Sequence, residues 1–460
     1  MDIPKKTHTL IIGAGLTGLS TAHYLRKAGI EFTVLEKDSR PGGVIQTCKE
    51  NGFIYEKGPN TGVIGSESIV ELFEDLKEHC ELETASKKVK KRYILKDGKW
   101  AALPTGLISG IKTPLFTLKD KFRLLAEPFR KRGTNPHETL AELVKRRMGK
   151  SFLEYAIDPF ILGVYAGNPE VLVPKYALPK LYNLEQNYGS FIGGAVKKRF
   201  EKKSDLEKKV TREVFSAKGG LSNFVNALYK SGGEENFIFE AKDITILPDS
   251  SNYKISFTLD GKPNEIFTEN VITTIGSYEL PALLPFINKE KMKEITELQY
   301  AKVTAVTLGF KKWTGIPLDG FGGLIPSKEQ RDILGVLFLS SLFIDRGPEG
   351  GALFTVFLGG SRNVHIADLP DDKIYAIVKN EIQNLLEISN FNPDIFKINR
   401  YKHAIPQYEA SSAIRYAAIN ETEQQYPGLK IGGNIRDGIG MADRAKQGKM
   451  LAEQIINSKS

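Results

Sequence analysis

The apolar positions at the start of the chain form two kinds of pattern, a continuous run and a helix-type spacing. A continuous apolar run at residues 10–12 passes into glycines and then into a helix-type pattern that extends to residue 25. A second short apolar run ends at Leu35. Short apolar runs next to glycine are typical of buried strands, so we predict a strand, a helix and a second strand over residues 31–35.

Later parts of the chain divide into a helical stretch and a strand-rich stretch. Helical patterns dominate residues 119–195, with breaks expected at Pro128, Pro136, Pro159 and Pro174. No repeat of fixed period and no low-complexity tract is present in the sequence. The strand-like runs that follow are FIFEAKDITILP, YKISFTLDG, NVITTIG, AVTLGF, GVLFLSSLF and ALFTVFLGG.

The first glycines have the spacing of a dinucleotide-binding turn. Gly13, Gly15 and Gly18 follow the first strand as G-x-G-x-x-G. Gly13 permits the tight turn, Gly15 leaves room for a pyrophosphate, and Gly18 lets the next helix pack closely on the strand. Leu16 and Thr17 begin that helix, whose free N–H groups can bind phosphate.

An acidic residue stands where such a turn needs one. Glu36 ends the second strand, 18 residues after Gly18, and Lys37 follows it. A carboxylate there accepts hydrogen bonds from ribose hydroxyls and repels the extra phosphate of NADP. A glycine turn without a ligand is the alternative, but strand, spacing, helix and acid all indicate a nucleotide.

A second glycine-rich element favours a flavin over a nicotinamide. LKIGGNIRDGIGMADRAKQG, residues 429–448, is predicted to form a short strand, a glycine turn and a helix that begins near Gly440. Gly433, Gly438 and Gly440 would let the backbone approach a flavin ring. A helix N-terminus aimed at the pyrimidine end stabilises the negative charge that develops on reduction.

Composition excludes several other classes. A chain of 460 residues suggests two or three interwoven domains. No apolar segment precedes the first strand, and no run has the length that spans a bilayer. Cys48 and Cys80 lack C-x-x-C spacing, which favours a reducing compartment. The six scattered histidines argue against a metal site.

The net charge of +9 is concentrated in two places. Residues 112–147 carry ten Lys or Arg and four Asp or Glu, and TPLFTLKDKFRLLAEPFRKR interleaves basic residues with Leu and Phe. Such a segment suits an anionic membrane surface, and an ordinary amphipathic surface helix is the alternative. The second run, residues 197–212, is expected to be a solvated helix or loop. Neither run comes with a nucleic-acid-binding motif.

Further motifs resemble a known family. RPGGVIQT and GFIYEKGPNTG look like glycine motifs of the flavin amine oxidase superfamily. FILGVYAGNPEVL, ALPKLYNLEQNYGS, AKGGLSNF, LFLSSLF, AIPQY and the final GGN with DGIG resemble, in this order, the protoporphyrinogen oxidase family. The resemblance covers residues 9–448. LPTGLISGIKTPLFTLKDKFRLLAEPFRKR is similar to the membrane-facing segment of that family.

The resemblance implies an α/β fold with three parts. They are a Rossmann-like FAD-binding domain, a mixed-sheet substrate domain and a helical membrane-binding insertion. The FAD-binding domain would comprise residues 1–75, 196–280 and 406–460. The substrate domain would comprise residues 76–105 and 281–405, and the insertion residues 106–195.

The resemblance also implies a reaction. Protoporphyrinogen IX would be oxidised to protoporphyrin IX in haem biosynthesis, with six electrons passed through FAD to molecular oxygen and peroxide formed. The enzyme would be cytoplasmic, peripheral on the anionic inner face of the cell membrane, with no nucleic-acid partner. A homodimer and an assembly with the next haem-synthesis enzyme are both left open.

Site residues follow from the matched motifs. Asn60 would lie beside substrate and flavin, Arg92 would meet a propionate, and Gly163 would make room for a ring. Leu334 and Phe357 would line the macrocycle. Without the resemblance, each would be interpreted as an ordinary core residue of a strand. No acid or base is assigned. The further FAD-binding positions are Gly42, Gly43, Val44, Gly58, Pro59, Asn60, Ile244, Thr274, Gly433, Asn434, Gly438, Ile439 and Met441.

Other interpretations stay open at this point. AIPQY lacks the tryptophan-containing and histidine-ended flanks common in the family, and the insert AVKKRFEKKSDLEKK has no assigned role. Coproporphyrinogen III oxidation by the same chemistry would need basic groups for four carboxylates. A flavin amine oxidase, a carotenoid desaturase and a prenyl-carrier protein without cofactor are the remaining alternatives.

Overall fold

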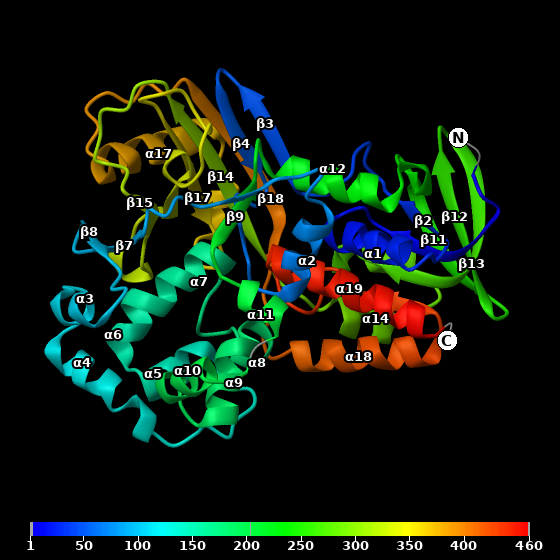
Figure 1. Ribbon diagram of the computed structural model, residues 1–460, viewed down its shortest axis with the longest axis horizontal. Coiled ribbons are helices and arrows are strands. Elements are labelled where there is room, and N and C mark those ends of the chain that lie inside the picture. Colours follow the sequence, from blue (N-terminus) through cyan, green and yellow to red (C-terminus); the bar gives the residue numbers. More distant parts are fainter. Residues whose placement is uncertain (1–2, 203, 459–460) are drawn as a thin grey trace.

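The computed structural model describes residues 3–202 and 204–458. The predicted domain ends at residues 1 and 460, and Lys203 of the second basic run, lie outside these residues. The described chain forms two seven-stranded sheets, a three-stranded sheet, a two-stranded sheet and a helical region. In Figure 1, sheet 1 and its helices lie on the right, sheet 2 at the upper left and the helical region at the lower left.

Sheet 1 contains the strand that leads into the first glycine motif. In order across the sheet its strands are β10 (Phe237–Ile238), β2 (Phe32–Leu35), β1 (Lys6–Ile12), β13 (Lys262–Thr273), β12 (Asn252–Leu259) and β11 (Lys242–Asp249), and β19 (Leu429–Ile431) also pairs with β13. β10, β2, β1, β13 and β19 run parallel to one another. β12 runs antiparallel to both of its neighbours, β13 and β11. β2 is buried along its whole length, as is typical of parallel strands covered by helices on both faces.

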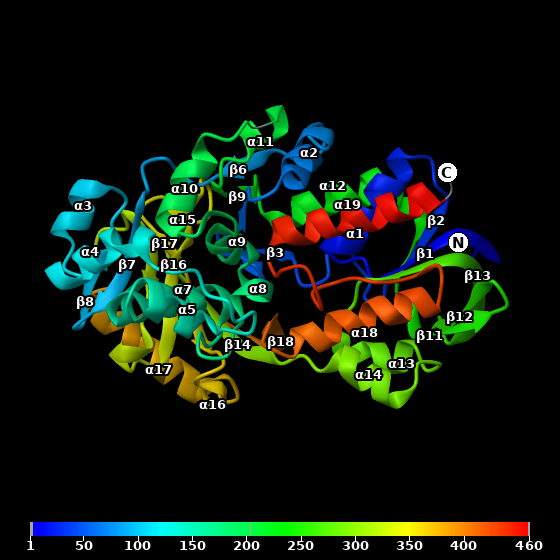
Figure 2. The ribbon, with the colours of Figure 1, turned by 90° about the horizontal axis from the view of Figure 1, so that it is seen from below.

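Helices cover both faces of sheet 1 (Figure 2). One face carries α1 (Leu16–Lys27), α12 (Leu221–Gly232) and α19 (Met441–Ser458), and α2 (Glu67–Asp75) packs against α19. The other face carries α13 (Leu280–Leu283), α14 (Lys289–Thr296) and α18 (Ser412–Gln425). Small residues let α1 and α19 pack closely, because a Cβ on Gly448 would lie only 2.5 Å from Cβ of Ser20. The last helix therefore returns to the first one.

Sheet 2 is mixed. In order its strands are β18 (Ile395–Pro406), β14 (Tyr300–Phe310), β17 (Ala352–Gly359), β16 (Ile333–Phe338), β15 (Gly320–Leu324), β7 (Lys91–Lys96) and β8 (Lys99–Ala102). β7 runs parallel to β15, and the other neighbours are antiparallel. One face packs against α17 (Asp371–Leu385) and the opposite face against α7 (Asp158–Tyr165). The predicted mixed α/β fold is confirmed.

The chain is helical between β8, the last strand in the order of sheet 2, and β9 (Val214–Ala217), a strand of another sheet. Its helices are α3 (Leu107–Lys112), α4 (Leu118–Leu125), η1 (Glu127–Phe129), α5 (Leu140–Arg147), α6 (Lys150–Phe152), η2 (Leu153–Ile157), α7, α8 (Pro174–Ala177), α9 (Pro179–Tyr188), α10 (Phe191–Arg199) and α11 (Asp205–Lys209). Helix is therefore confirmed over the predicted stretch, and it extends beyond both predicted ends. The predicted boundary between residues 195 and 196 falls within α10. Across the described residues, none of the helices has both the length and the apolarity to cross a bilayer.

A buried ion network ties the helical region together. Arg147 is fully buried, and its Nε and Nη1 donate to Oε1 of Glu127 and Oε1 of Glu185, each at 2.6 Å. Glu127 also accepts the Ser190 hydroxyl at 2.7 Å and the Phe191 N–H at 2.9 Å. Burial would raise the pKa of Glu127, but these donors outweigh burial and lower it. The network fixes η1 against α5, α9 and α10.

Two predicted strand runs contain breaks. GVLFLSSLF continues β16 only to Phe338, after which Leu339–Leu342 form the short helix α15, with both leucines buried three residues apart on one side. An apolar run alone does not distinguish a strand from such a helical turn. FIFEAKDITILP divides into β10 and β11 near Glu240, whose φ is +58°. The remaining elements are β3 (Gln46–Glu50), β4 (Phe53–Lys57), β5 (Gly62–Val63), β6 (Leu82–Thr84), η3 (Glu234–Asn236), η4 (Ser277–Glu279), η5 (Ser327–Glu329) and α16 (Val364–Ala367).

Candidate active site

The first glycine turn links β1 to α1 and leaves space above the start of the helix. Gly13 has φ +102°, and a Cβ there would lie 2.9 Å from Oγ1 of Thr274. A Cβ on Gly18 would lie 1.9 Å from the Gly13 carbonyl oxygen. A Cβ on Gly15 would meet no atom of the described residues within 4 Å. The three glycines therefore differ, since only Gly15 borders open space.

Glu36 reaches back from the end of β2 to this turn. Its Oε2 accepts the N–H of Ala14 at 2.6 Å, and Oε1 accepts the N–H of Asp38 at 2.9 Å. Burial raises the pKa of Glu36, and the two backbone donors oppose that shift. Each carboxylate oxygen has a second lone pair with which to accept a ribose hydroxyl. Beside it, Lys37 forms an ion pair with Glu279 of η4.

A second glycine pair lies against the first turn. Gly43 has φ +57°, and a Cβ there would lie 3.3 Å from Cα of Gly15. Its neighbour Gly42 has φ +101°. Farther along, a Cβ on Gly58 would lie 2.2 Å from the carbonyl oxygen of Val44, so these two segments also touch. Turns far apart in sequence thus form one continuous backbone surface.

The C-terminal glycine turn completes this surface. Gly433 has φ +87°, and a Cβ there would lie 3.0 Å from the carbonyl carbon of Thr274. The hydroxyl of Tyr408 lies 2.8 Å from the carbonyl oxygen of Asn434 and 2.9 Å from that of Gly438. We call the surface formed by residues 13–18, 42–44, 58, 274 and 433–438 the glycine cradle.

The helix after the C-terminal turn begins at the cradle. Met441 is the first residue of α19 and is buried, and Ile439 is partly buried against the core under sheet 1. Ile244 lies near the start of β11 and packs against the same core. The N–H of Ala241, three residues earlier, donates to the Glu36 carbonyl oxygen at 3.0 Å. The structure thereby brings the start of β11 close to the end of β2.

The cradle fits a dinucleotide. Gly15 borders open space at the start of α1, where free helix N–H groups bind phosphate. The Thr17 hydroxyl, on the second residue of α1, is buried and has no hydrogen-bond partner in residues 3–202 or 204–458. An orphaned hydroxyl of this kind suits a phosphate oxygen. Together with Glu36 at the ribose position, these groups match the donors and acceptors of FAD.

One face of sheet 2 carries the predicted substrate residues. Ile94 pairs with Leu324, and across the next strands Leu324, Gly335, Phe357 and Ala305 pair in turn. Residues paired across neighbouring strands point to the same side of a sheet. This row therefore marks a single face, the one turned towards α7.

Leu334 and Phe357 meet on this face. The strand register shifts between Ile333 and Gly335, which turns Leu334 towards α7. Leu334 is buried with Leu162 of α7 and with Ala166, the residue that follows α7, and Phe357 packs against the same cluster. We call this cluster the apolar floor.

Asn60 connects the cradle to the apolar floor. Its Oδ1 accepts the hydroxyl of Thr355 at 2.9 Å, and Thr355 stands two residues before Phe357 on the same side of β17. Pro59 separates Asn60 from Gly58, whose N–H donates to the Tyr401 hydroxyl of β18 at 2.8 Å. The cradle and sheet 2 are therefore held together at the predicted substrate position.

Arg92 lies on the same face of sheet 2, and Gly163 lies on α7, the helix that packs against this face. Arg92 stands two residues before Ile94 on β7 and is exposed, with its guanidinium 4.9 Å from the centre of the Phe321 ring. A Cβ on Gly163 would lie 2.3 Å from Cδ2 of Leu324, so this glycine admits a leucine of β15. Among the described residues, Arg92 forms no hydrogen bond, ion pair or ring contact with a member of the apolar floor.

Sequence patterns did not identify the tyrosines that brace the site. The hydroxyl of Tyr300 accepts the N–H of Ser277 at 3.3 Å and lies 3.2 Å from Oδ1 of Asn434. Burial raises the pKa of Tyr300 and of Tyr401, so both hydroxyls keep their protons at neutral pH. A single tyrosine on a strand gives no sequence signal. Tyr408 did have a sequence signal, because it ends the motif AIPQY.

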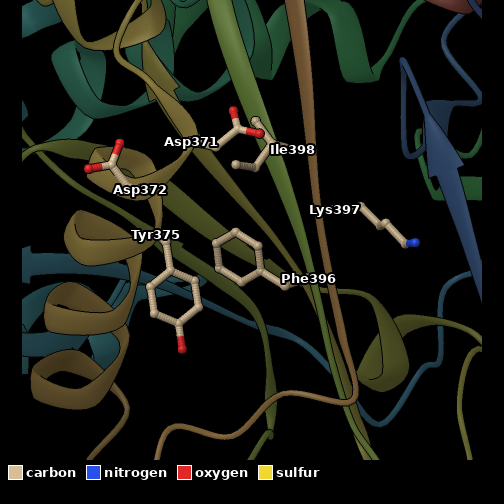
Figure 3. A pocket seen from close by; sticks show the side chains of 6 residues that line it. All are labelled: Asp371, Asp372, Tyr375, Phe396, Lys397 and Ile398. Carbon is tan, nitrogen blue, oxygen red and sulfur yellow. The ribbon is translucent and has the colours of Figure 1, made fainter.

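A pocket on the other face of sheet 2 contains none of the predicted site residues (Figure 3). It measures about 390 Å³ and lies between the start of α17 and β18. The rings of Tyr375 and Phe396 have centroids 4.9 Å apart, and Lys397 points away from them. Asp371 is already paired with Arg400 at 2.6 Å. In residues 3–202 and 204–458, no group of three metal-ligating side chains exists.

The fold and the cradle together define a flavin-dependent oxidoreductase. A helix-covered parallel sheet presents glycine turns and an acid to a dinucleotide, and a second sheet presents an apolar face beside them. The model of the family described as flavin containing amine oxidoreductase matches residues 16–456. The chain belongs to this family, and its cofactor is FAD.

Individual relatives match the chain over nearly its whole length. Protoporphyrinogen oxidase 2 of Arabidopsis thaliana is 31% identical over 97% of this chain and 93% of that protein. Coproporphyrinogen III oxidase of Bacillus subtilis is 27% identical over 98% of each. A crystal structure of an Exiguobacterium protein has a TM-score of 0.80 with 23% identity and covers 100% of both chains. That structural likeness supports the fold.

Proposed function

We propose that the protein is an FAD-dependent oxidase that converts protoporphyrinogen IX to protoporphyrin IX in haem biosynthesis. The observation that carries the proposal is the hydrogen bond between Asn60 and Thr355, which sets the apolar floor directly against the glycine cradle. A flat, largely apolar macrocycle needs a broad apolar wall next to the flavin. The Arabidopsis relative, named a protoporphyrinogen oxidase, supports this substrate.

The residues of the chain would act mainly by placement. Bound FAD supplies a hydride acceptor and returns the electrons to molecular oxygen, with peroxide as product. Leu334 and Phe357 would hold the macrocycle so that a bridging carbon faces the cofactor, and such orientation lowers the barrier without an acid or base. Arg92 would bind a propionate through its planar guanidinium. Asn60 would donate its amide NH2 to substrate or flavin.

Coproporphyrinogen III is the second candidate substrate. The Bacillus subtilis relative, named coproporphyrinogen III oxidase, matches 98% of the chain. The two porphyrinogens differ in carboxylate number, four against two, and a tetracarboxylate would need further basic groups near the floor. Amine oxidation is the alternative at the level of the whole family.

We also propose that α3, α4 and η1 attach the enzyme to the cytoplasmic face of an anionic membrane. Support comes from apolar side chains that are largely exposed, with Phe122 at 70% and Phe129 at 89%. Basic residues lie among them in the sequence, a combination that suits an interfacial segment. The other exposed members are Ile108, Ile111, Leu118 and Leu125. A second copy of the chain and the next haem-synthesis enzyme are the proposed protein partners.

An aerobic turnover assay tests the proposed reaction. The purified holoenzyme is given protoporphyrinogen IX, coproporphyrinogen III or a primary amine, and porphyrin fluorescence and peroxide are measured together. We expect protoporphyrin to form fastest, with about three peroxides for each porphyrin, because six electrons leave in two-electron steps. Faster turnover of the tetracarboxylate would select the second candidate. Peroxide formed only from the amine would refute porphyrinogen oxidation.

A further inference from the structure

A lysine of the helical region reaches the start of α19. Lys180, on α9, is a surface residue whose Nζ turns inward and donates to the Gly65 carbonyl oxygen at 2.8 Å. A Cβ on Gly65 would lie 3.8 Å from this Nζ and 3.7 Å from Cβ of Ala442. Because Ala442 is the second residue of α19, the ammonium lies beside the first turn of that helix.

Other cations gather at the same place. The backbone N–H of Arg212 donates to the Ile64 carbonyl oxygen at 3.0 Å, which sets Arg212 next to Gly65. Lys446 stands one helical turn after Ala442 and so lies on the same side of α19. Within the part of the chain that the structure describes, Lys180, Arg212 and Lys446 form no ion pair.

The carboxylate of Asp443 is the counter-charge at this helix end. Its Oδ2 accepts the N–H of Gly440 at 3.1 Å. Burial lowers the pKa of Lys180, and Asp443 opposes that shift, while Arg212 and Lys446 add to it. Positive charge therefore exceeds negative charge at the start of α19.

A flavin becomes more negative when it accepts a hydride, and the charge spreads into its pyrimidine ring. Positive groups held in place near that ring favour reduction, because they interact more strongly with the charged form. The helix end contributes partial charge, and a full charge contributes more.

We propose that Lys180 supplies a fixed positive charge to the pyrimidine end of the bound FAD and so raises its reduction potential. This inference rests on the proposed function and on the flavin position expected from the second glycine-rich element, in which the start of α19 faces the pyrimidine ring. Lys180 is a positioning charge contributed by the helical region, whose other end carries the proposed membrane segment.

Glutamine substitution separates charge from hydrogen bonding. Lys180→Gln keeps a donor for the Gly65 carbonyl but removes the charge, and Lys180→Arg keeps both. Lys197→Gln is the matched control, since Lys197 is exposed on α10 and Lys180, not Lys197, donates to the Gly65 carbonyl oxygen. The midpoint potential of each holoenzyme is measured by reductive titration against a reference dye, and flavin N3–H ionisation is followed by absorbance.

We expect Lys180→Gln to lower the equilibrium constant for flavin reduction about tenfold. For a two-electron couple this corresponds to a midpoint potential lower by about 30 mV. Its N3–H pKa should rise, because the ionised flavin loses a favourable neighbour. Lys180→Arg and Lys197→Gln should stay within about twofold of the wild type. Asp443→Asn should shift the potential the other way, which tests the inference even if a Lys180 variant folds poorly.

An unchanged potential in Lys180→Gln would overturn the inference. An unchanged potential together with a raised KM for porphyrinogen would instead make Lys180 a ligand for a substrate carboxylate. The titration uses no porphyrinogen, so it is independent of the substrate. A shifted potential in an enzyme that no porphyrinogen reduces would refute the proposed function and leave the role of Lys180 intact.

Discussion

Gly15 and Gly18 stand three residues apart in one turn, yet an added methyl group would act on them in opposite ways. A Cβ on Gly18 would overlap the Gly13 carbonyl oxygen, whereas a Cβ on Gly15 would meet no described protein atom within 4 Å. The first site is needed by the fold. The second is needed only by a ligand that lies over the start of α1.

We therefore expect Gly15→Ala to fold but to lose FAD. Its apoprotein, prepared by chaotropic dialysis, should melt within about 1 °C of the wild-type apoprotein, because a surface change away from contacts costs little. Its flavin content, from absorbance at the flavin band relative to protein, should fall at least tenfold. Gly18→Ala is the comparison and should lower the melting temperature of the apoprotein itself. Full flavin retention by Gly15→Ala would contradict the position of the pyrophosphate.

His23 gives a prediction about pH. Its Nδ1 lies 2.7 Å from the Ser231 hydroxyl and its Nε2 3.1 Å from Oδ2 of Asp75, which joins α1, α12 and α2. Burial lowers the pKa of His23 below its ordinary value of 6.5, although the hydrogen bond with Asp75 opposes the shift. The unfolded chain therefore binds a proton at a pH where the folded chain does not.

Stability should accordingly fall as pH drops below about 6.5 and level off below the folded-state pKa. One proton changes the free energy of unfolding by at most about 1.4 kcal/mol per pH unit. Melting curves of wild type and His23→Gln between pH 5 and 8 measure this contribution as their difference. His137→Gln, at an exposed site, should keep the wild-type slope. Equal slopes in wild type and His23→Gln would exclude the linkage.

Among helices, strands and turns, the sequence pattern predicted those whose conformation depends mainly on residues close in the chain. The strands β1, β2, β12, β14, β17 and β19, the glycine turns and the helix that begins at Met441 each depend on neighbouring residues, and each was predicted from them. The strands β7, β8, β15 and β18 of sheet 2 were not predicted. The helix α15 was missed because an apolar run fits a strand and a buried helical turn equally well. The position of α10 across a predicted domain boundary was missed because Phe191 and Ile192 contact Glu127, a residue distant in sequence.

The buried ion network should govern the stability of the helical region. Arg147→Met leaves the buried Glu127 without its cation, while Glu185 keeps its ion pair with Arg146. Loss of one partner from a buried ion pair typically costs about 3–5 kcal/mol. Lys145→Met is the control on the same helix, since its exposed ion pair with Glu170 should contribute below about 1 kcal/mol. Hydrogen exchange of amides in α5 and α9 reports the opening free energy of this region. Equal effects of the two substitutions would show that burial of the network adds nothing.

The exposed apolar side chains of α4 and η1 should decide membrane binding. Phe122→Ser and Phe129→Ser should each weaken partitioning to anionic vesicles roughly tenfold, because each loses the transfer free energy of a phenyl ring. Phe200→Ser is the control, since Phe200 is 81% exposed beside the basic end of α10. Vesicle sedimentation with and without added salt measures both contributions. A loss in Phe200→Ser equal to that in Phe122→Ser would contradict the proposed segment.

At the scale of the whole molecule, the site is assembled from distant segments. Asn60 and Thr355 are 295 residues apart in the chain, and Gly58 and Tyr401 are 343 apart. Sequence could indicate each glycine turn, because a turn is a local structure. It could not indicate these partners, because they depend on the strand register of sheet 2, and a single strand does not specify its neighbours.

The same limit applies to Arg92. Its sequence motif predicted a role with a carboxylate, whereas the structure gives its place: Arg92 is exposed on β7, one strand in from the edge of sheet 2, on the face that carries the apolar floor. The neighbouring Lys91 points to the opposite face and pairs with Asp319. These two cations therefore form a matched pair for testing which side of sheet 2 the substrate uses.

The most direct test of the account is anaerobic reduction of the flavin by protoporphyrinogen IX and by coproporphyrinogen III, with wild type, Arg92→Met and Lys91→Met compared. We predict faster bleaching by protoporphyrinogen IX, the dicarboxylate, and recovery of the flavin band when oxygen is admitted. The concentration of protoporphyrinogen IX that gives half the maximal rate of bleaching should rise only in Arg92→Met. A flavin that neither porphyrinogen bleaches, or that coproporphyrinogen III bleaches faster, would show that protoporphyrinogen IX is not the substrate.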